Sequence, residues 1–265
     1  MIPKKIHFIY GLKPDFGGIP FNFCHWVAVK SAAKLNPDYE IHFWYEFEPD
    51  TKYFNDLKNQ MILHKITAPK EIFGNPIPHF AHRADVLRLQ ILLEHGGVYL
   101  DMDTITVKPY DFFLDKKVVM SVVKNSGNVY GLCNAVMMGE QNAVFFSEWL
   151  KAFKGFRSQG YDQFYDEFAC NYPYVLATQI PNEITVYDET LFFVPDMTND
   201  GLYKLFNDPN SCNPNAFCHH LWEKNSQELL KNMNESNYDH LKGLYSRHLK
   251  EILALDVYNF IVNAI

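Results

Sequence analysis

One continuous block near the middle of the chain restricts the fold more than any other stretch. Apolar residues recur at helical spacing over residues 78–95, which predicts a helix. Gly96 and Gly97 follow where a helix would end in a left-handed C-cap, and Val98–Leu100 has the composition of a buried strand. A helix that leads directly into a buried strand is typical of α/β proteins, whose ligands bind at the carboxyl ends of the strands.

The rest of the pattern extends this prediction to a mainly parallel sheet flanked by helices. Residues 5–10 and 39–45 predict strands, and residues 21–35 between them predict a helix, so the chain opens with a βαβ unit. Further elements are expected as strands at 118–123 and 135–138, a helix at 143–153, two short β runs around Asp188 and Glu189 within 182–194, and a helical tail over about 228–265. No repeat or linker divides the chain, so residues 1–265 are expected to form a single domain.

Charge and cysteine content exclude several classes of protein. The formal net charge is -7 and no basic stripe is visible, which argues against nucleic acid as a partner. The 5 cysteines are scattered without a CxxC pair, so neither a disulfide scaffold nor a zinc knuckle is expected. No run of 18 apolar residues predicts a membrane-spanning helix. We therefore expect a cytoplasmic protein without a transmembrane segment, and leave peripheral contact with a membrane open.

Asp101 and Asp103 directly follow the predicted strand of the central block. An Asp-x-Asp pair is usually a solvated turn, but a pair at the end of a buried strand can share a divalent cation. Carboxylate oxygens suit Mg²⁺ or Mn²⁺. A cation that also binds a diphosphate would neutralise the charge that develops on a leaving nucleotide. The pair therefore predicts a metal-assisted site.

Asp85 and Arg88 lie three residues apart on the preceding predicted helix and so share one of its faces. One interpretation is a surface ion pair that contributes at most ~1 kcal/mol. The other is that Asp85 accepts a hydrogen bond from a ribose or sugar hydroxyl while Arg88 orients Asp85 or a phosphate.

The whole block AHRADVLRLQILLEHGGVYLDMDT, residues 81–104, resembles the DXD sugar-binding region of glycosyltransferase family 32. That family includes α-1,4-galactosyltransferases, mannosyltransferases and capsular polysaccharide enzymes, and the large clostridial glucosylating toxins have a similar block. The resemblance implies a GT-A type nucleotide-sugar-binding fold and a retaining, metal-dependent transfer. The donor would be a nucleotide diphosphate sugar such as a UDP-sugar, and the acceptor a glycan or a lipid-linked hydroxyl compound.

Three further stretches agree with this resemblance and assign roles to single residues. Tyr10 ends a first strand similar to that of the toxins, in which an aromatic residue stacks on uracil. The alternative is that Tyr10 only packs in the core. Asn134 resembles the asparagine that touches the donor sugar, although it could cap a turn. His220 lies in a stretch similar to one in the galactosyltransferases and would be the third metal ligand, with His219 as the alternative if the two loop histidines are misaligned. An imidazole must be neutral to bind a metal.

The same C-terminal stretch places Lys224 and Ser226 where they could hold the diphosphate. The chain departs from the family at Ala84, where a serine is common, and residues 172–181 lack the family's Gly-Pro near the acceptor site. Acceptor binding is therefore the least transferable feature.

Two alternatives to a glycosyltransferase fit parts of the sequence. Haloacid-dehalogenase-type phosphatases also place an Asp-x-Asp after an apolar strand, but near the N-terminus and with Thr or Val where this chain has Ile105. A non-catalytic sugar-nucleotide binding module is not excluded by residue content.

Overall fold

The computed structural model describes residues 1–125 and 127–263, with side chains described as far as residue 254. The strands are β1 (Lys5–Tyr10), β2 (Glu40–Tyr45), β3 (Ile62–Lys65), β4 (Glu71–Ile72), β5 (Asn75–Pro76), β6 (Gly97–Leu100), β7 (Thr104–Thr106), β8 (Val118–Asn125), β9 (Asn128–Leu132), β10 (Val136–Gly139), β11 (Thr185–Tyr187) and β12 (Cys218–His220). The helices are α1 (Phe23–Leu35), α2 (Lys52–Leu57), α3 (Phe80–His95), α4 (Val144–Ala152), α5 (Tyr172–Gln179), α6 (Asn199–Phe206), α7 (Glu223–Leu230) and α8 (Leu244–Asn263).

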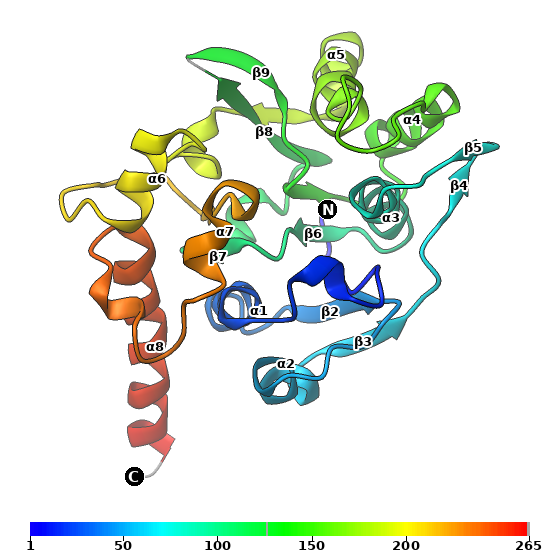
Figure 1. The fold of residues 1–265 in the computed structure, drawn as a ribbon. Coiled ribbons are helices and arrows are strands. Elements are labelled where there is room, and N and C mark those ends of the chain that lie inside the picture. The colour runs from blue at the N-terminus through cyan, green and yellow to red at the C-terminus, as the bar shows by residue number, and fades with distance from the viewer. Residues whose placement is uncertain (126, 264–265) are drawn as a thin grey trace.

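An eight-stranded sheet forms the centre of the molecule (Figure 1). Its strands follow the order β11-β8-β10-β6-β1-β2-β3, with β9 paired to β8. The pairs β1–β2, β1–β6, β2–β3 and β8–β11 are parallel, whereas β10 runs antiparallel to both of its neighbours. The prediction of an α/β fold with a mainly parallel sheet is confirmed.

Helices cover both faces of this sheet because side chains of successive strand residues point to opposite faces. In β1, Ile6 and Phe8 join a cluster that includes apolar residues of α1, α2 and α8, whereas Ile9 joins a second cluster with residues of α3, α4 and α5. Figure 1 shows α1 and α2 on one side of the sheet and α3 and α4 on the other. The functional side chains lie at the carboxyl edge between these two layers.

Gly96 and Gly97 make the sharp connection from α3 to β6. Their φ angles are 62° and 107°, which L side chains rarely adopt. A Cβ on Gly97 would also lie 2.6 Å from the carbonyl oxygen of Lys5 on the neighbouring strand. The predicted helix end is therefore confirmed, and the glycine pair lets β6 pair closely with β1.

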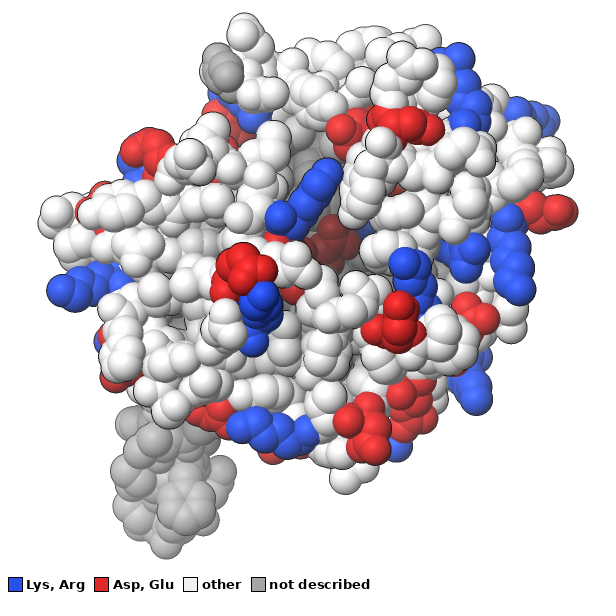
Figure 2. Space-filling model, in the orientation of Figure 1, with Lys and Arg blue, Asp and Glu red and all other residues white. Residues whose placement is uncertain are grey.

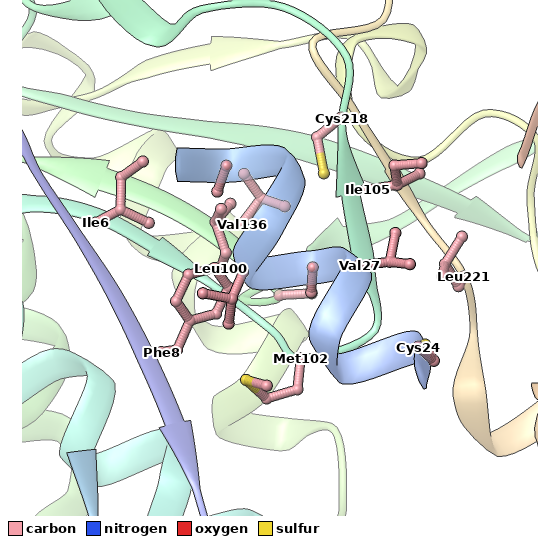
Figure 3. Packing of buried hydrophobic residues seen from close by; sticks show 14 of the residues in the cluster. Ile6, Phe8, Cys24, Val27, Leu100, Met102, Ile105, Val136, Cys218 and Leu221 are labelled. Carbon is pink, nitrogen blue, oxygen red and sulfur yellow. The ribbon is translucent and has the colours of Figure 1, made fainter. Parts of the chain in front are cut away.

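The alternation of β6 continues past its end and determines which way the two aspartates face. Leu100 and Met102 are buried in the cluster beneath α1 (Figure 3), where they pack near Val27 and Phe8. Asp101 and Asp103 point the other way.

Most elements begin and end within two residues of their predicted bounds. The second β run predicted after Asp188 is a 3₁₀ turn, Glu189–Leu191, and not a strand. Phe192 and Phe193 beside it are fully buried in irregular chain, so their apolar character reflects packing and not strand pairing. The predicted helical tail is confirmed over α8, but α7 ends at Leu230 and the only helical segment within residues 231–243 is a 3₁₀ turn, so that part of the prediction is wrong. Residues 264–265 lie outside the described residues.

Candidate functional site

Asp101, Asp103 and His220 converge at the carboxyl edge of the sheet, as predicted. One potential ligand atom from each of the three lies within 4.8 Å of the others. The pairing of β12 with β7 brings the histidine there, because it sets His220 directly opposite Thr104, the residue after Asp103. Two carboxylates and one imidazole form a donor set that suits Mn²⁺ or Mg²⁺.

The Asp103 carboxylate is held from two sides. Its Oδ1 lies 3.2 Å from Nε2 of His220, and its Oδ2 accepts the backbone N–H of Glu223 at 2.7 Å. Burial would raise the pKa of Asp103, but the charge and hydrogen bond of His220 outweigh it and lower that pKa to about 2. Burial would likewise lower the pKa of His220, but Asp103 outweighs it and raises that pKa to about 9.

His219 points away from this site, which decides between the two adjacent histidines. Its Nδ1 lies 2.9 Å from the carbonyl oxygen of Val194, and its side chain is buried. Burial lowers the pKa of His219 to about 3, so the ring is neutral and structural. One nitrogen of each ring, Nε2 of His219 and Nδ1 of His220, is buried without a hydrogen-bond partner among the described residues, so the two histidines differ in where they point and not in this respect.

Asp101 is fixed through a single carboxylate oxygen. Tyr99 donates its hydroxyl to Oδ1 at 2.6 Å, and Nη1 of Arg88 lies 3.1 Å from the same oxygen. Burial raises the pKa of Asp101, and the Arg88 charge offsets this only in part. Among the described residues no contact to Oδ2 is found, so that oxygen is available to a ligand.

Arg88 also links Asp101 to Asp85, which lies nearly three helix turns before the end of α3. Its Nη1 donates to the carbonyl oxygen of Asn134 at 2.6 Å, and its Nη2 lies 3.5 Å from Oδ1 of Asp85. Asn134 completes the network by donating from Nδ2 to the same Asp85 oxygen at 2.8 Å. All three side chains are buried. The pair predicted on one helix face is thus a buried network and not a surface ion pair.

Asn134 reaches this network because β10 runs antiparallel to β6. Val136 pairs with Leu100, so the residues just before β10 lie beside the residues just after β6. The sequence-predicted partners Asp85, Arg88, Asn134 and Asp101 therefore form one connected group of side chains.

Tyr10 ends β1 at the same edge, half-buried in an aromatic cluster. Its ring lies 5.8 Å from Phe16 in a stacked arrangement and 4.7 Å from His25, and its hydroxyl donates to the carbonyl oxygen of Ile19. His25 in turn lies 3.2 Å from the carboxylate of Glu223. This contact connects the Tyr10 cluster to the start of α7. Uracil stacking by Tyr10 stays a prediction.

The two residues predicted to hold the diphosphate differ in position. Lys224 is exposed, one residue after the Glu223 amide that binds Asp103, and its ammonium lies over the rings of Tyr161 and Tyr165. Ser226 is buried, and its hydroxyl donates to the backbone carbonyl of Leu221 at 2.7 Å. This placement supports a phosphate contact for Lys224 and not for Ser226.

Sequence reasoning missed two contacts of the site. Tyr99 precedes Asp101 by two residues, and strand alternation could have placed both on one side of the chain. His82 lies three residues before Asp85 on α3, and its Nδ1 is 3.1 Å from the Asp85 carboxylate. Its other nitrogen lies 2.9 Å from the hydroxyl of Ser158, a contact that no local pattern could have predicted.

Asp188 and Glu189 lie outside the connected group of side chains that contains Asp85 and Asp101. Both carboxylates form ion pairs with Lys124, at 3.3 and 2.6 Å.

Figure 2 shows recessed acidic atoms near the centre of the face that carries the site, beside a basic side chain at the opening. The site is therefore an acidic hollow with a basic side chain at its rim.

Several known proteins are similar to this chain in sequence or in fold. Residues 25–120 match the family model described as a glycosyltransferase sugar-binding region containing DXD motif. Glucan organizing enzyme 1 of Cryptococcus neoformans var. grubii serotype A is 27% identical, over 96% of this chain and 71% of that protein. The apo form of the glycosyltransferase GlyE of Streptococcus pneumoniae superposes with a TM-score of 0.52 at 11% identity, over 96% of this chain and 64% of that chain. PaToxG glycosyltransferase superposes with a TM-score of 0.46 at 20% identity, over 68% of this chain and 70% of that chain.

The GlyE likeness concerns the fold alone, whereas the family match covers Asp85, Arg88, Asp101 and Asp103. The family match favours glycosyl transfer over the phosphatase alternative. Within the described part of the chain, no helix combines the length and the apolar character that crossing a membrane requires. Residues 25–120 resemble the DXD-containing sugar-binding region of glycosyltransferases, and the fold is of the GT-A type.

Proposed function

We propose that this glycosyltransferase takes its sugar from a UDP-sugar and uses Mn²⁺, or Mg²⁺, bound by Asp101, Asp103 and His220. The acceptor is a hydroxyl of a glycan or a lipid-linked compound. The observation that carries this proposal is the convergence of three potential ligand atoms within 4.8 Å from two distant parts of the chain. Retention of configuration is part of the proposal and rests on the family resemblance.

The residues present fit a divalent cation. Oδ2 of Asp101 has no partner among the described residues, and Asp103 and His220 face each other at 3.2 Å. The remaining Asp103 oxygen and the Asp101 Oδ1 atom are held by the protein, which pre-orients both carboxylates. Partners that orient metal ligands in this way are a regular feature of metal sites. When bound, the cation would supply positive charge to the diphosphate leaving group.

The other residues of the site contact the base, the sugar and the diphosphate of the donor. Tyr10 offers an aromatic face to the uracil ring at the end of β1. Asp85 accepts a hydrogen bond from a sugar hydroxyl at Oδ2, which contacts His82 and has a second lone pair, whereas Oδ1 already faces both Asn134 and Arg88. Asn134 donates from its side-chain Nδ2 to Asp85, and we assign its side-chain oxygen to the sugar. Lys224 binds the diphosphate from the solvent side.

Arg88 acts through other residues and not on the donor itself. It is buried between Asp85 and Asp101 and lies over the ring of Tyr99, with 4.5 Å from the guanidinium carbon to the ring centroid. Its charge opposes the rise that burial causes in the pKa of Asp101. We therefore assign Arg88 as a positioning residue.

Titration calorimetry with UDP tests the metal bridge. The acidic site should repel a bare diphosphate, so UDP should bind in Mn²⁺ and not in EDTA. Asp103→Asn should abolish binding in Mn²⁺, whereas Asp115→Asn, which changes an exposed carboxylate outside the site, should leave it unchanged. Equal UDP affinity in EDTA and Mn²⁺ would overturn the proposal.

A further inference from the structure

An aromatic cluster outside the metal site faces the same opening. Tyr161, which is 65% exposed, and Tyr165 lie with ring centroids 4.8 Å apart, and His79 at the start of α3 lies 4.8 Å from Tyr161. Lys224 contacts both rings, the exposed ring of Tyr161 and the partly buried ring of Tyr165. The proposed donor site makes no use of them.

The loop that carries these tyrosines is tied to Asp85. Ser158, buried at the start of the loop, lies 2.9 Å from Nε2 of His82, whose Nδ1 contacts Asp85 at 3.1 Å. The same serine hydroxyl lies 2.9 Å from Oδ1 of Asp162, which also accepts the backbone N–H of Phe164. The loop that carries the tyrosines is therefore held by hydrogen bonds and is connected, through Ser158 and His82, to Asp85, the carboxylate assigned to the donor sugar.

Lys224 occupies the ring surface in this structure. Its ammonium is 4.4 Å from the ring centroid of Tyr161 and 5.3 Å from that of Tyr165, and among the described residues it has no carboxylate partner. The backbone N–H of the preceding residue, Glu223, binds Asp103. Because a lysine side chain is longer than the ~3.8 Å between neighbouring Cα atoms, Lys224 can turn from the rings to a diphosphate at the metal site.

We propose that Tyr161 and Tyr165 form the platform for a pyranose ring of the acceptor glycan, and that Lys224 covers this platform until a bound diphosphate draws it away. This inference rests on the proposed function. The apolar face of a pyranose stacks on aromatic rings, and an ammonium is held more strongly by a diphosphate than by a ring face. Donor binding thus uncovers the acceptor site, which orders the two substrates.

The position of the rings favours the acceptor over the donor sugar. Asp85 and Asn134, assigned to the donor sugar, are each 7% exposed at the base of the site, whereas Tyr161 is 65% exposed at its rim. A single donor sugar bound at the base would lie inward of the rim. A glycan acceptor must approach from solvent and continue outward, which is where the rings lie.

Saturation-transfer NMR tests this with the methyl α-glycopyranosides of glucose, galactose and mannose as probes. Wild type should give signals from at least one probe in the presence of Mn²⁺ and UDP, and much weaker signals without UDP. Tyr161→Ala should weaken probe binding by about tenfold or more, as expected for loss of a stacking partner, while Tyr161→Trp should restore it. Lys224→Met should bind the probe without UDP. Tyr203→Ala, which removes a tyrosine that is 56% exposed on α6, should change nothing.

Different results would contradict the aromatic platform, the covering role of Lys224 and the assignment to the acceptor. If no probe binds wild type with Mn²⁺ and UDP, or if Tyr161→Ala binds as well as wild type, the platform is wrong. Equal probe binding with and without UDP refutes the covering role of Lys224. If Asp85→Asn removes the signal while Tyr161→Ala keeps it, the probe occupies the donor-sugar position and the acceptor assignment is wrong. Failure of UDP itself to bind in Mn²⁺ would instead overturn the proposed function.

Discussion

If His220 binds the metal as proposed, its pairing with Asp103 makes the affinity for the metal depend on pH. Asp103 raises the pKa of His220 to about 9, so the imidazole carries a proton at neutral pH in the metal-free protein. Metal binding needs the neutral ring, and the proton must leave. Affinity should therefore fall as pH falls below the raised pKa, and not only below the ordinary histidine value of ~6.5.

The magnitude can be worked out from that pKa. At pH ~7 the ring lies about two units below its pKa, so deprotonation costs about 2.7 kcal/mol and lowers the affinity for Mn²⁺ about 100-fold relative to the plateau above pH ~9. Between these limits affinity should rise about tenfold per pH unit, with release of about one proton per metal ion.

Calorimetry of Mn²⁺ binding in buffers of different ionisation enthalpy measures both quantities. His220→Ala should bind Mn²⁺ more weakly at high pH and lose most of the slope between about pH 7 and 9, since no other ligand titrates there. His219→Gln should keep the slope, because burial lowers the pKa of His219 to about 3 and its ring is already neutral. A wild-type slope that survives in His220→Ala would refute the assignment of His220 as the ligand.

Substitutions of Arg88 and Tyr10 test the residues that surround the proposed metal site. Arg88→Met should lower the free energy of unfolding by about 3–5 kcal/mol, since it strands the buried carboxylates of Asp85 and Asp101; urea denaturation checks this against Arg157→Met in a surface pair, which should cost at most ~1 kcal/mol. Tyr10→Ala should weaken UDP binding by about 1–3 kcal/mol through lost stacking, whereas Tyr10→Phe should keep the affinity and lose only about 1 kcal/mol of stability with the hydrogen bond to Ile19. Equal small effects of both Tyr10 changes on affinity would make Tyr10 core filler.

Local patterns were sufficient for the elements that carry the site. Helical spacing up to His95, the glycine pair and the apolar strand after it specify α3, β6 and the position of Asp101 and Asp103 at a strand end. The βαβ opening was predictable for the same reason, because hydrophobic period and turn residues are encoded within a few residues of each other.

Contacts between distant segments were not accessible in this way. His82 and Ser158 are 76 residues apart, and neither stretch signals the other. His220 could be named only through family resemblance, since the β7–β12 pairing that carries it to Asp103 depends on the folded sheet. Likewise, the apolar run at Phe192 and Phe193 could equally describe a strand or a buried irregular segment, and tertiary packing decided for the second.

The central claim is that this chain uses a bound divalent cation to release UDP from a UDP-sugar. The most direct measurement is UDP release from a panel of UDP-sugars by wild type and Asp103→Asn, each with Mn²⁺ and with EDTA, alongside GDP-sugars and p-nitrophenyl phosphate. We expect release from at least one UDP-sugar by wild type in Mn²⁺ alone, and none from p-nitrophenyl phosphate. Release that persists in EDTA or in Asp103→Asn, or that occurs only from GDP-sugars, would contradict this account.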